Sequence, residues 1–175
     1  MWGFLLGAGL IMGAFLSGVA QITEAEFRRD VQYVERVEKR VKEIDRELQR
    51  KGVDSDLLGE LNSYGYPINM LKEKYIDYND KEYGELQDFY RRVTRVYNLI
   101  LYVKRGVFPK ILMDEVKQIE SPVCGIRAEG KRREVLTIVI EDPKNERAVL
   151  DLLTRTQLQY VHLLGVETVN FEKCP

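Results

Sequence analysis

The residue types best suited to metal, redox or nucleophilic chemistry are scarce in this chain. It has two cysteines, Cys124 and Cys174, and one histidine, His162. The cysteines lack the CxxC spacing of zinc and redox sites, and no thiol or carboxylate stands at helical spacing from the histidine. No serine or cysteine nucleophile is arranged with the histidine either. We therefore expect no catalytic residue, no metal site and no cofactor, in a protein that is not an enzyme.

The two cysteines flank the first and last of three predicted strands. If the third strand lies antiparallel beside the first, the start of one faces the end of the other, and Cys124 and Cys174 can form a disulfide. Such a bridge indicates an oxidising compartment, although intracellular proteins of hyperthermophiles are an exception. Against this, the run VLTIVI at 135–140 is apolar on both faces, which favours a central strand that separates the cysteines. The run equally suits an edge strand that pairs with another subunit.

Four cations cluster near the tip of a predicted β-hairpin, where they are candidates for contact with phosphates, lipid headgroups or an acidic partner: Arg127, Lys131, Arg132 and Arg133. The chain as a whole has a formal net charge of -1, and no aromatic residues alternate with these cations. A solvated turn is therefore favoured over nucleic-acid binding, and we expect no nucleic-acid partner.

The first residues of the chain raise the question of a membrane anchor. Residues 2–22 carry no charge, and about twenty residues at 1.5 Å each span about 30 Å, the thickness of a bilayer core. We favour a transmembrane helix over a cleaved signal, because small residues at 17–20 suit cleavage but no positively charged segment precedes the apolar run. The arginines and lysines that follow the run favour a cytoplasmic body.

Glycines in this segment suggest a further property. They form two GxxxG spacings that let a second helix approach closely: Gly3, Gly7, Gly9 and Gly13. The alternative is that glycine is simply common in membrane helices.

The middle of the chain, residues 23–106, predicts a helical hairpin or coiled-coil neck. Thr23 and Glu26 form a capping box, and apolar residues then recur at steps of three and four up to Leu48. A second amphipathic helix follows Asp80 and packs on the first, with homotypic pairing as the alternative. Between them, short helical pieces are expected, broken at Asn62–Pro67. The many tyrosines are candidates for interface anchors, although half-buried rings along the hairpin are favoured.

Residues 107–175 predict a small α+β domain. Pro109 suits the first turn of a helix, and two extended runs about a turn at 129–131 indicate a β-hairpin. A helix over 145–164 and a strand over 166–171 complete the order helix, strand, strand, helix, strand. The predicted domains are thus an anchor (1–22), a neck (23–106) and a head (107–175).

As an arrangement, the anchor, the charged helix, the segment PKILMDEVKQIESPVCGIRAEGKRREVLTIVIED and the final VETVNFEK resemble the inner-membrane assembly proteins of type IV pilus and type II secretion systems. The resemblance implies a single span, a coiled-coil neck and a ferredoxin-like extracytoplasmic head that dimerises. This chain departs from that pattern in three ways: residues 53–80 are extra, one strand of a complete ferredoxin-like set is missing, and no cytoplasmic recruitment peptide precedes the span.

These observations predict an α+β protein with an N-terminal transmembrane helix, a helical hairpin neck and a small ferredoxin-like αββαβ head. Its expected function is that of a membrane-anchored assembly subunit that works through helix pairing and head contacts. The expected partners are the membrane and other membrane-complex proteins, with a homodimer among the candidates. The alternative is a membrane-tethered domain that senses an anionic ligand on the cytoplasmic side. The possible bridge and the resemblance favour an extracytoplasmic head.

Overall fold

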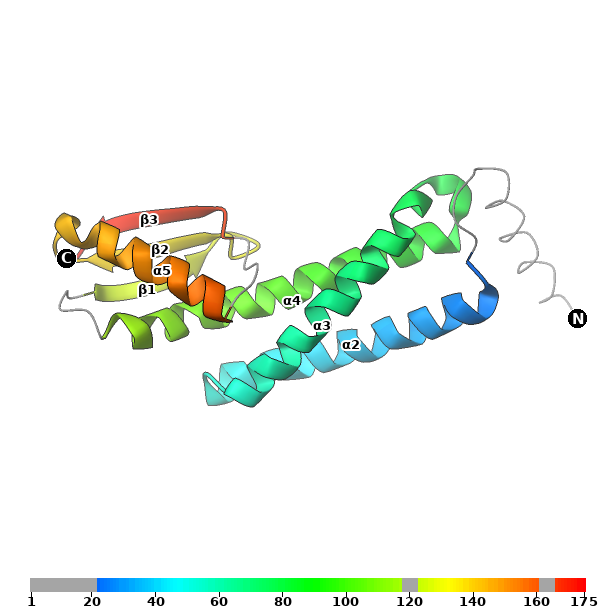
Figure 1. Ribbon diagram of the computed structural model, residues 1–175, viewed down its shortest axis with the longest axis horizontal. Helices are drawn as coiled ribbons and strands as arrows, with labels where there is room; N and C mark the ends of the chain where they lie inside the picture. Colours follow the sequence, from blue (N-terminus) through cyan, green and yellow to red (C-terminus); the bar gives the residue numbers. More distant parts are fainter. Residues whose placement is uncertain (1–21, 118–122, 161–165) are drawn as a thin grey trace, which may run out of the picture. The chain divides into compact units, whose positions relative to one another are not determined.

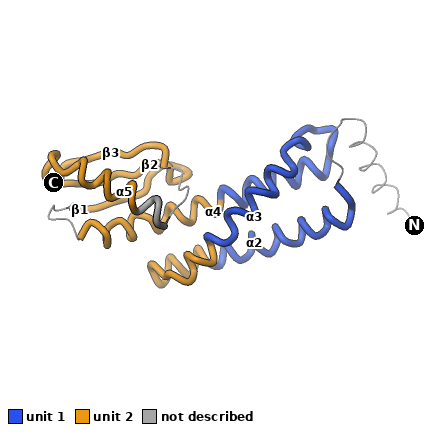
Figure 2. The backbone as a smooth tube through the Cα atoms, viewed as in Figure 1, with its two compact units in different colours: residues 1–43, 62–98 blue, residues 44–61, 99–175 orange. Residues whose placement is uncertain are grey.

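The computed structural model describes residues 22–117, 123–160 and 166–175 (Figure 1). The chain divides into two compact units, residues 1–43 with 62–98 and residues 44–61 with 99–175 (Figure 2). The helices and strands, in chain order, are α2 (Glu24–Lys51), α3 (Ser55–Tyr75), α4 (Glu85–Val116), β1 (Val123–Glu129), β2 (Val135–Ile140), α5 (Glu146–Tyr160) and β3 (Thr168–Lys173), with short 3-10 turns at Ile76–Tyr78, Lys81–Tyr83 and Pro143–Asn145.

Helix α2 begins where the capping box predicts, and a glycine, the residue typical of helix ends, follows its last residue. The backbone N–H of Glu26 donates to Oγ1 of Thr23 at 3.2 Å, which satisfies one of the open donors of the first turn. At the other end, Gly52 has a φ of 87°, a conformation that glycine adopts without strain. The apolar stripe is buried at Val34, Val37, Val41, Ile44 and Leu48. A capped, amphipathic helix of this kind is encoded locally.

Helix α3 replaces the short pieces expected between the two neck helices. It runs without interruption through Asn62–Pro67, so the predicted hairpin is in fact a set of three long helices. Pro67 lacks the N–H that an interior helical position uses, and this normally weakens a helix. The side chains of Leu57, Leu61, Ile68 and Tyr75 are buried along one side of α3. Packing of this side outweighs the poor helix propensity.

Helix α4 likewise continues past the expected break at Arg105–Gly106 and contains Pro109 in its interior. The predicted neck and head helices are therefore one helix. Its C-terminal part contributes Phe108, Leu112 and Val116 to an apolar core in the second unit.

The sheet has three strands in the order β1-β2-β3. β1 pairs with β2 antiparallel, with a register shift between Val123 and Gly125, and β2 pairs with β3 in parallel. As its two apolar faces suggest, β2 is central, and Leu136, Ile138 and Ile140 are buried against α4 and α5. The fold class predicted from the sequence is wrong: the described residues are mostly helical, with a small three-stranded sheet in place of a ferredoxin-like head on a hairpin neck.

The predicted membrane helix also requires correction. Within residues 22–117, 123–160 and 166–175, no helix combines the length and the apolar character needed to cross a bilayer. This finding overturns the predicted single-pass membrane protein and, with it, the predicted membrane localisation with an extracytoplasmic head. Gly3, Gly7, Gly9 and Gly13 lie outside the described residues, as does His162.

Candidate functional site

A cluster of ionisable side chains joins α2 to the C-terminal end of α3. Lys74 Nζ lies 2.6 Å from Asp30 Oδ2 and 2.6 Å from Glu26 Oε1. The hydroxyl of Tyr75, whose side chain is fully buried, donates to the same Asp30 oxygen at 2.7 Å. The ring of Tyr75 also makes edge contacts with Phe89, at 4.8 Å between centroids. Four polar groups are thus held together at one helix–helix contact.

The pKa shifts of Tyr75, Glu26 and Lys74 indicate that this cluster has a structural role. Burial, and then the hydrogen bond to Asp30, raise the pKa of the Tyr75 phenol far above its usual range. The hydrogen bond from Lys74 lowers the pKa of Glu26, although desolvation opposes it. Desolvation lowers the pKa of Lys74, but the hydrogen bonds to Asp30 and Glu26 outweigh it and raise the pKa overall. A phenol that stays protonated and a lysine that stays charged are poor general bases, which argues against a catalytic role for the cluster. Its hydrogen bonds and ion pairs instead join α2 to α3.

A second ionic tie joins α2 to α4. Arg92 donates through Nε to Glu38 and through Nη1 to Glu35, each at 3.0 Å. Glu38 also accepts from Lys42 at 2.7 Å, and the hydrogen bonds from Lys42 and Arg92 lower the pKa of Glu38 despite partial desolvation. The Glu38 carboxylate of this tie is therefore ionised at neutral pH.

The four cations considered as contacts for an anionic partner have different surroundings. Arg127 lies on β1 and donates to Glu129 at 2.7 Å and to Glu172 of β3 at 2.6 Å. Lys131 and Arg132 are in the exposed or half-exposed turn after β1. Arg133 lies 3.9 Å over the Tyr102 ring and donates to the Tyr102 carbonyl at 3.2 Å. Two of the four are thus engaged within the protein.

The turn that carries these cations is attached to α4. The side chain of Arg105 is buried and donates to the Arg132 carbonyl at 2.8 Å. The Arg133 guanidinium lies against Gly106, where an added Cβ would meet Nη1 at 1.9 Å. Because Nη1 is at the far end of a flexible side chain, a larger residue at position 106 would displace the guanidinium rather than disrupt the helix.

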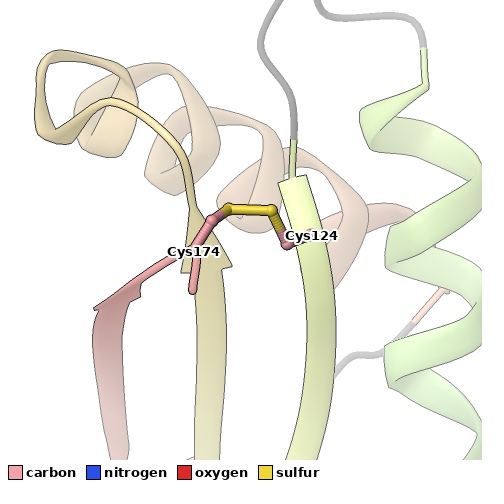
Figure 3. The surroundings of a disulfide bond; sticks show 2 residues. All are labelled: Cys124 and Cys174. Atoms are coloured by element: carbon pink, nitrogen blue, oxygen red, sulfur yellow. A yellow bond between two sulfur atoms is a disulfide. The ribbon is translucent and has the colours of Figure 1, made fainter.

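Cys124 and Cys174 form a disulfide, with 6.0 Å between their Cα atoms (Figure 3). Strands on either side of a third strand lie about 10 Å apart, more than a disulfide spans. However, β1 starts and β3 ends beside the last residue of β2, Ile140. Cys124 is the extra residue of the β1 irregularity, and Cys174 follows β3 with its N–H bonded to the Ile140 carbonyl. The bridge therefore passes across the end of the central strand, and the predicted disulfide is confirmed.

The second unit also has a shallow surface pocket of about 480 Å³, lined by Val53, Pro109, Lys110, Met113, Asp114 and Ile126. The lining is mostly apolar, and Asp114 pairs with Lys117 at 2.9 Å. Over the described part of the chain, no group of three or more histidine, cysteine or acidic side chains could hold a metal ion. The pocket therefore does not bring together groups that could act on a substrate.

Among the described residues, two of the large hydrophobic side chains that are exposed lie one turn apart on α3. The side chain of Tyr66 is 73% exposed and that of Met70, one turn later, is 45% exposed. Residues 61–71 contain no charged side chain, in a chain of which 31% is charged. We call Asn62, Ser63, Tyr66 and Met70 the α3 face; all four are exposed. From the sequence, Tyr66 is only one of many tyrosines and Met70 is not predicted as a functional residue, although the uncharged run is a signal that the sequence contains.

Comparison with known proteins relates this chain to a protein of another organism. The chain is 29% identical, over 131 residues, to an uncharacterized protein of Aquifex aeolicus strain VF5, and the match covers 75% of this chain and 78% of that protein. No family model and no solved structure matches the chain. The resemblance to pilus and secretion assembly proteins is not tested by these comparisons and stays a prediction.

Proposed function

We propose that this protein is a structural or assembly subunit that acts through protein contacts, and that the α3 face is its contact surface. The observation that carries the proposal is the pair of exposed side chains Tyr66 and Met70, one turn apart in an uncharged stretch of a highly charged chain. Tyrosine and methionine are enriched at the centres of protein interfaces, whereas charged residues are depleted there.

An exposed apolar side chain is common on any protein surface and needs no explanation alone. The α3 face differs in that its two large side chains are adjacent on one helix surface and have no charged neighbour between Leu61 and Leu71. The fold itself depends on the opposite side of the helix, where Ile68 and Tyr75 are fully buried. Tyr66 and Met70 are therefore not needed to pack α3 against the rest of the protein. We assign them a role in contact with another protein.

The hydrogen bonds between α2 and α3 favour a fixed position for the α3 face. Lys74 and Tyr75 hold the end of α3 to α2 through Asp30. A contact surface on a helix that is fixed at its end loses little conformational entropy on binding. The protein would then act by position, presenting the α3 face to its partner.

The alternative of an anionic-ligand sensor has less support. Arg127 is paired with Glu129 and Glu172, and Arg133 is packed on Tyr102. Lys131 and Arg132 alone would form a small cationic site on a turn.

The test is site-specific photo-cross-linking of the full chain in the cells that produce it. A photoreactive phenylalanine derivative replaces Tyr66, and in a matched control it replaces Gln32, an exposed residue of α2. We expect a protein adduct from position 66 that disappears when Met70→Glu is added, because a buried carboxylate opposes the contact. Equal adducts from both positions, or none from position 66, would overturn the proposal.

A further inference from the structure

We infer that the bridge between Cys124 and Cys174 is a redox switch for β3. The disulfide fixes β3 on β2, and its reduction releases β3 and opens that edge of β2. The two observations behind this inference are the exposure of the bridge and the shallow burial of β3. The switch concerns the second unit alone and does not depend on the α3 face.

Strand β3 is packed less deeply than its neighbour in the sheet. None of its six side chains is buried, and only Val169 and Phe171 are half-buried against the apolar core. In β2, by contrast, Leu136, Ile138 and Ile140 are buried. Burial of apolar area supplies most of the free energy that holds an element in place. Strand β3 therefore depends on its other ties more than β2 does.

An ion pair and a hydrogen bond add to the pairing of β3 with β2. Glu172 pairs with Arg127 at 2.6 Å, but both side chains are about half exposed, and an exposed ion pair contributes little to stability. The backbone N–H of Glu167 donates to the Glu134 carbonyl at 2.8 Å, beside the start of β3. The disulfide is the covalent tie, and it lies at the other end of the strand.

The position of the bridge makes it accessible to a reductant. It passes across the end of β2, with Cys124 exposed and Cys174 half-buried (Figure 3). In thiol–disulfide exchange, a thiolate must reach one of the two sulfur atoms. Sγ of Cys124 is therefore the point of attack, and Cys174 leaves as a thiolate.

The reductant is a dithiol, which needs no further co-reactant. Its first thiolate forms a mixed disulfide with Cys124 as the bond to Cys174 breaks, and the Cys174 thiolate takes up a proton. Its second thiolate attacks the reductant's own sulfur in the mixed disulfide and releases Cys124, which is protonated in turn. The bridge gains two electrons and two protons, and the dithiol becomes a disulfide.

Reduction removes a constraint at one end of β3. The bridge joins residues that are 50 positions apart, and cutting it returns conformational entropy to the chain between them when β3 is unpaired. Release of β3 exposes backbone donors and acceptors of β2 from Val135 to Ile140. An apolar strand with an open edge pairs readily with another strand. The oxidised protein thus keeps closed an edge that the reduced protein presents.

The test is hydrogen–deuterium exchange of the full chain before and after reduction with dithiothreitol, followed by mass spectrometry. The amides of β3 should exchange at least about tenfold faster after reduction, because release leaves them open to water. The amides of β1 and α2 are the internal references and should exchange at unchanged rates. Reoxidation with oxidised glutathione should restore slow exchange in β3.

Two variants control this measurement. The double variant Cys124→Ser/Cys174→Ser should show fast exchange in β3 without dithiothreitol and no further change when it is added. Glu172→Gln keeps the bridge but removes the ion pair with Arg127, so β3 should exchange within about twofold of the parent rate. If the double variant does not fold, the reduced parent still gives the comparison.

Three results would overturn the switch. Slow exchange of β3 in the reduced parent would show that β3 stays paired without the bridge. Equal acceleration in β1 and β3 would show that the bridge supports the whole sheet. A bridge that dithiothreitol reduces no faster than the protein unfolds, by titration of free thiols against the unfolding rate, would show that the reductant does not reach Cys124 in the folded state.

Discussion

Helices α2 and α3 both bury an apolar stripe, but they present different surfaces to solvent. More than half of the residues of α2 are charged, and many of them pair with residues one turn away, as in Arg28 with Glu24 and Lys42 with Glu38. The centre of α3 is uncharged and exposes Tyr66 and Met70. Charged side chains keep the exposed side of α2 hydrated, whereas residues 61–71 of α3 carry no charge that a contact would have to desolvate. The difference indicates that α2 supports the structure and α3 makes contacts.

The largest effect on the free energy of unfolding should come from substitutions on the buried sides of α2 and α3, where the two helices are alike. Ile44 of α2 and Ile68 of α3 are both fully buried. Ile44→Ala and Ile68→Ala should each lower the free energy of unfolding by about 2–5 kcal/mol, because each leaves a cavity in a packed interior. Urea unfolding measures both. A small loss for Ile68→Ala alone would show that the buried side of α3 is loosely packed and that the two helices differ there as well.

The two sides of α3 should differ in their response to the loss of a phenol hydroxyl. Tyr75→Phe removes the hydrogen bond to Asp30 in a buried site and should cost about 1–2 kcal/mol. Tyr66→Phe removes a hydroxyl from a side chain that is 73% exposed and should change the free energy of unfolding little. Thermal unfolding of the two variants gives the comparison. Similar losses in both would contradict the assignment of Tyr75 to a structural tie.

The tie between α2 and α3 should also depend on pH. The pKa of Glu26 is lowered by Lys74, so its contribution to stability is present above the ordinary value of 4.5 and is lost as the pH falls through the lowered pKa. The pKa of Lys74 is raised, so its contribution is present below the ordinary value of 10.5 and is lost as the pH rises through the raised pKa.

Because both side chains are about one-third exposed, we expect an effect of less than about 1 kcal/mol at either end of this pH range. The measurement is the free energy of unfolding against pH for the parent and for Lys74→Met. The parent should lose more stability below pH 4.5 than the variant does. Parallel curves would exclude the pair as a source of pH dependence.

The smallest effect on folding should come from the exposed faces. Met70→Glu on α3 and Gln32→Glu on α2 should each leave the free energy of unfolding within about 0.5 kcal/mol of the parent. Only Met70→Glu should weaken association, because only α3 is a contact surface. A large loss of stability in Met70→Glu would place Met70 in the folded interior and remove the contrast between the helices.

The sequence predicts α2 well because its signals are local. Thr23 starts the helix, Gly52 ends it, and the apolar period lies between them. The continuity of α3 could not be predicted, because Gly65 and Pro67 disfavour a helix and the compensating burial of Leu61 and Ile68 depends on other helices. The α3 face, likewise, could be predicted only in part. The uncharged run 61–71 is visible in the sequence, but the exposure of Met70 becomes evident only when the buried side of α3 is known.

The disulfide shows a similar limit in the sheet. The sequence indicates both a central β2 and a bridge between Cys124 and Cys174, and these two expectations conflicted. In the structure they are compatible, because β1 and β3 both reach the end of β2 at Ile140. Strand order and direction depend on pairing between distant segments, which local patterns do not encode.

Hydroxyl-radical footprinting tests whether another protein chain covers the α3 face. The measurement compares side-chain oxidation in living cells with that in dilute purified protein, with Tyr33 of α2 as the internal reference. We predict that Tyr66 and Met70 are oxidised more slowly in cells relative to Tyr33. Equal relative rates in the two conditions would show that the α3 face remains open to water and would contradict its role as a contact surface.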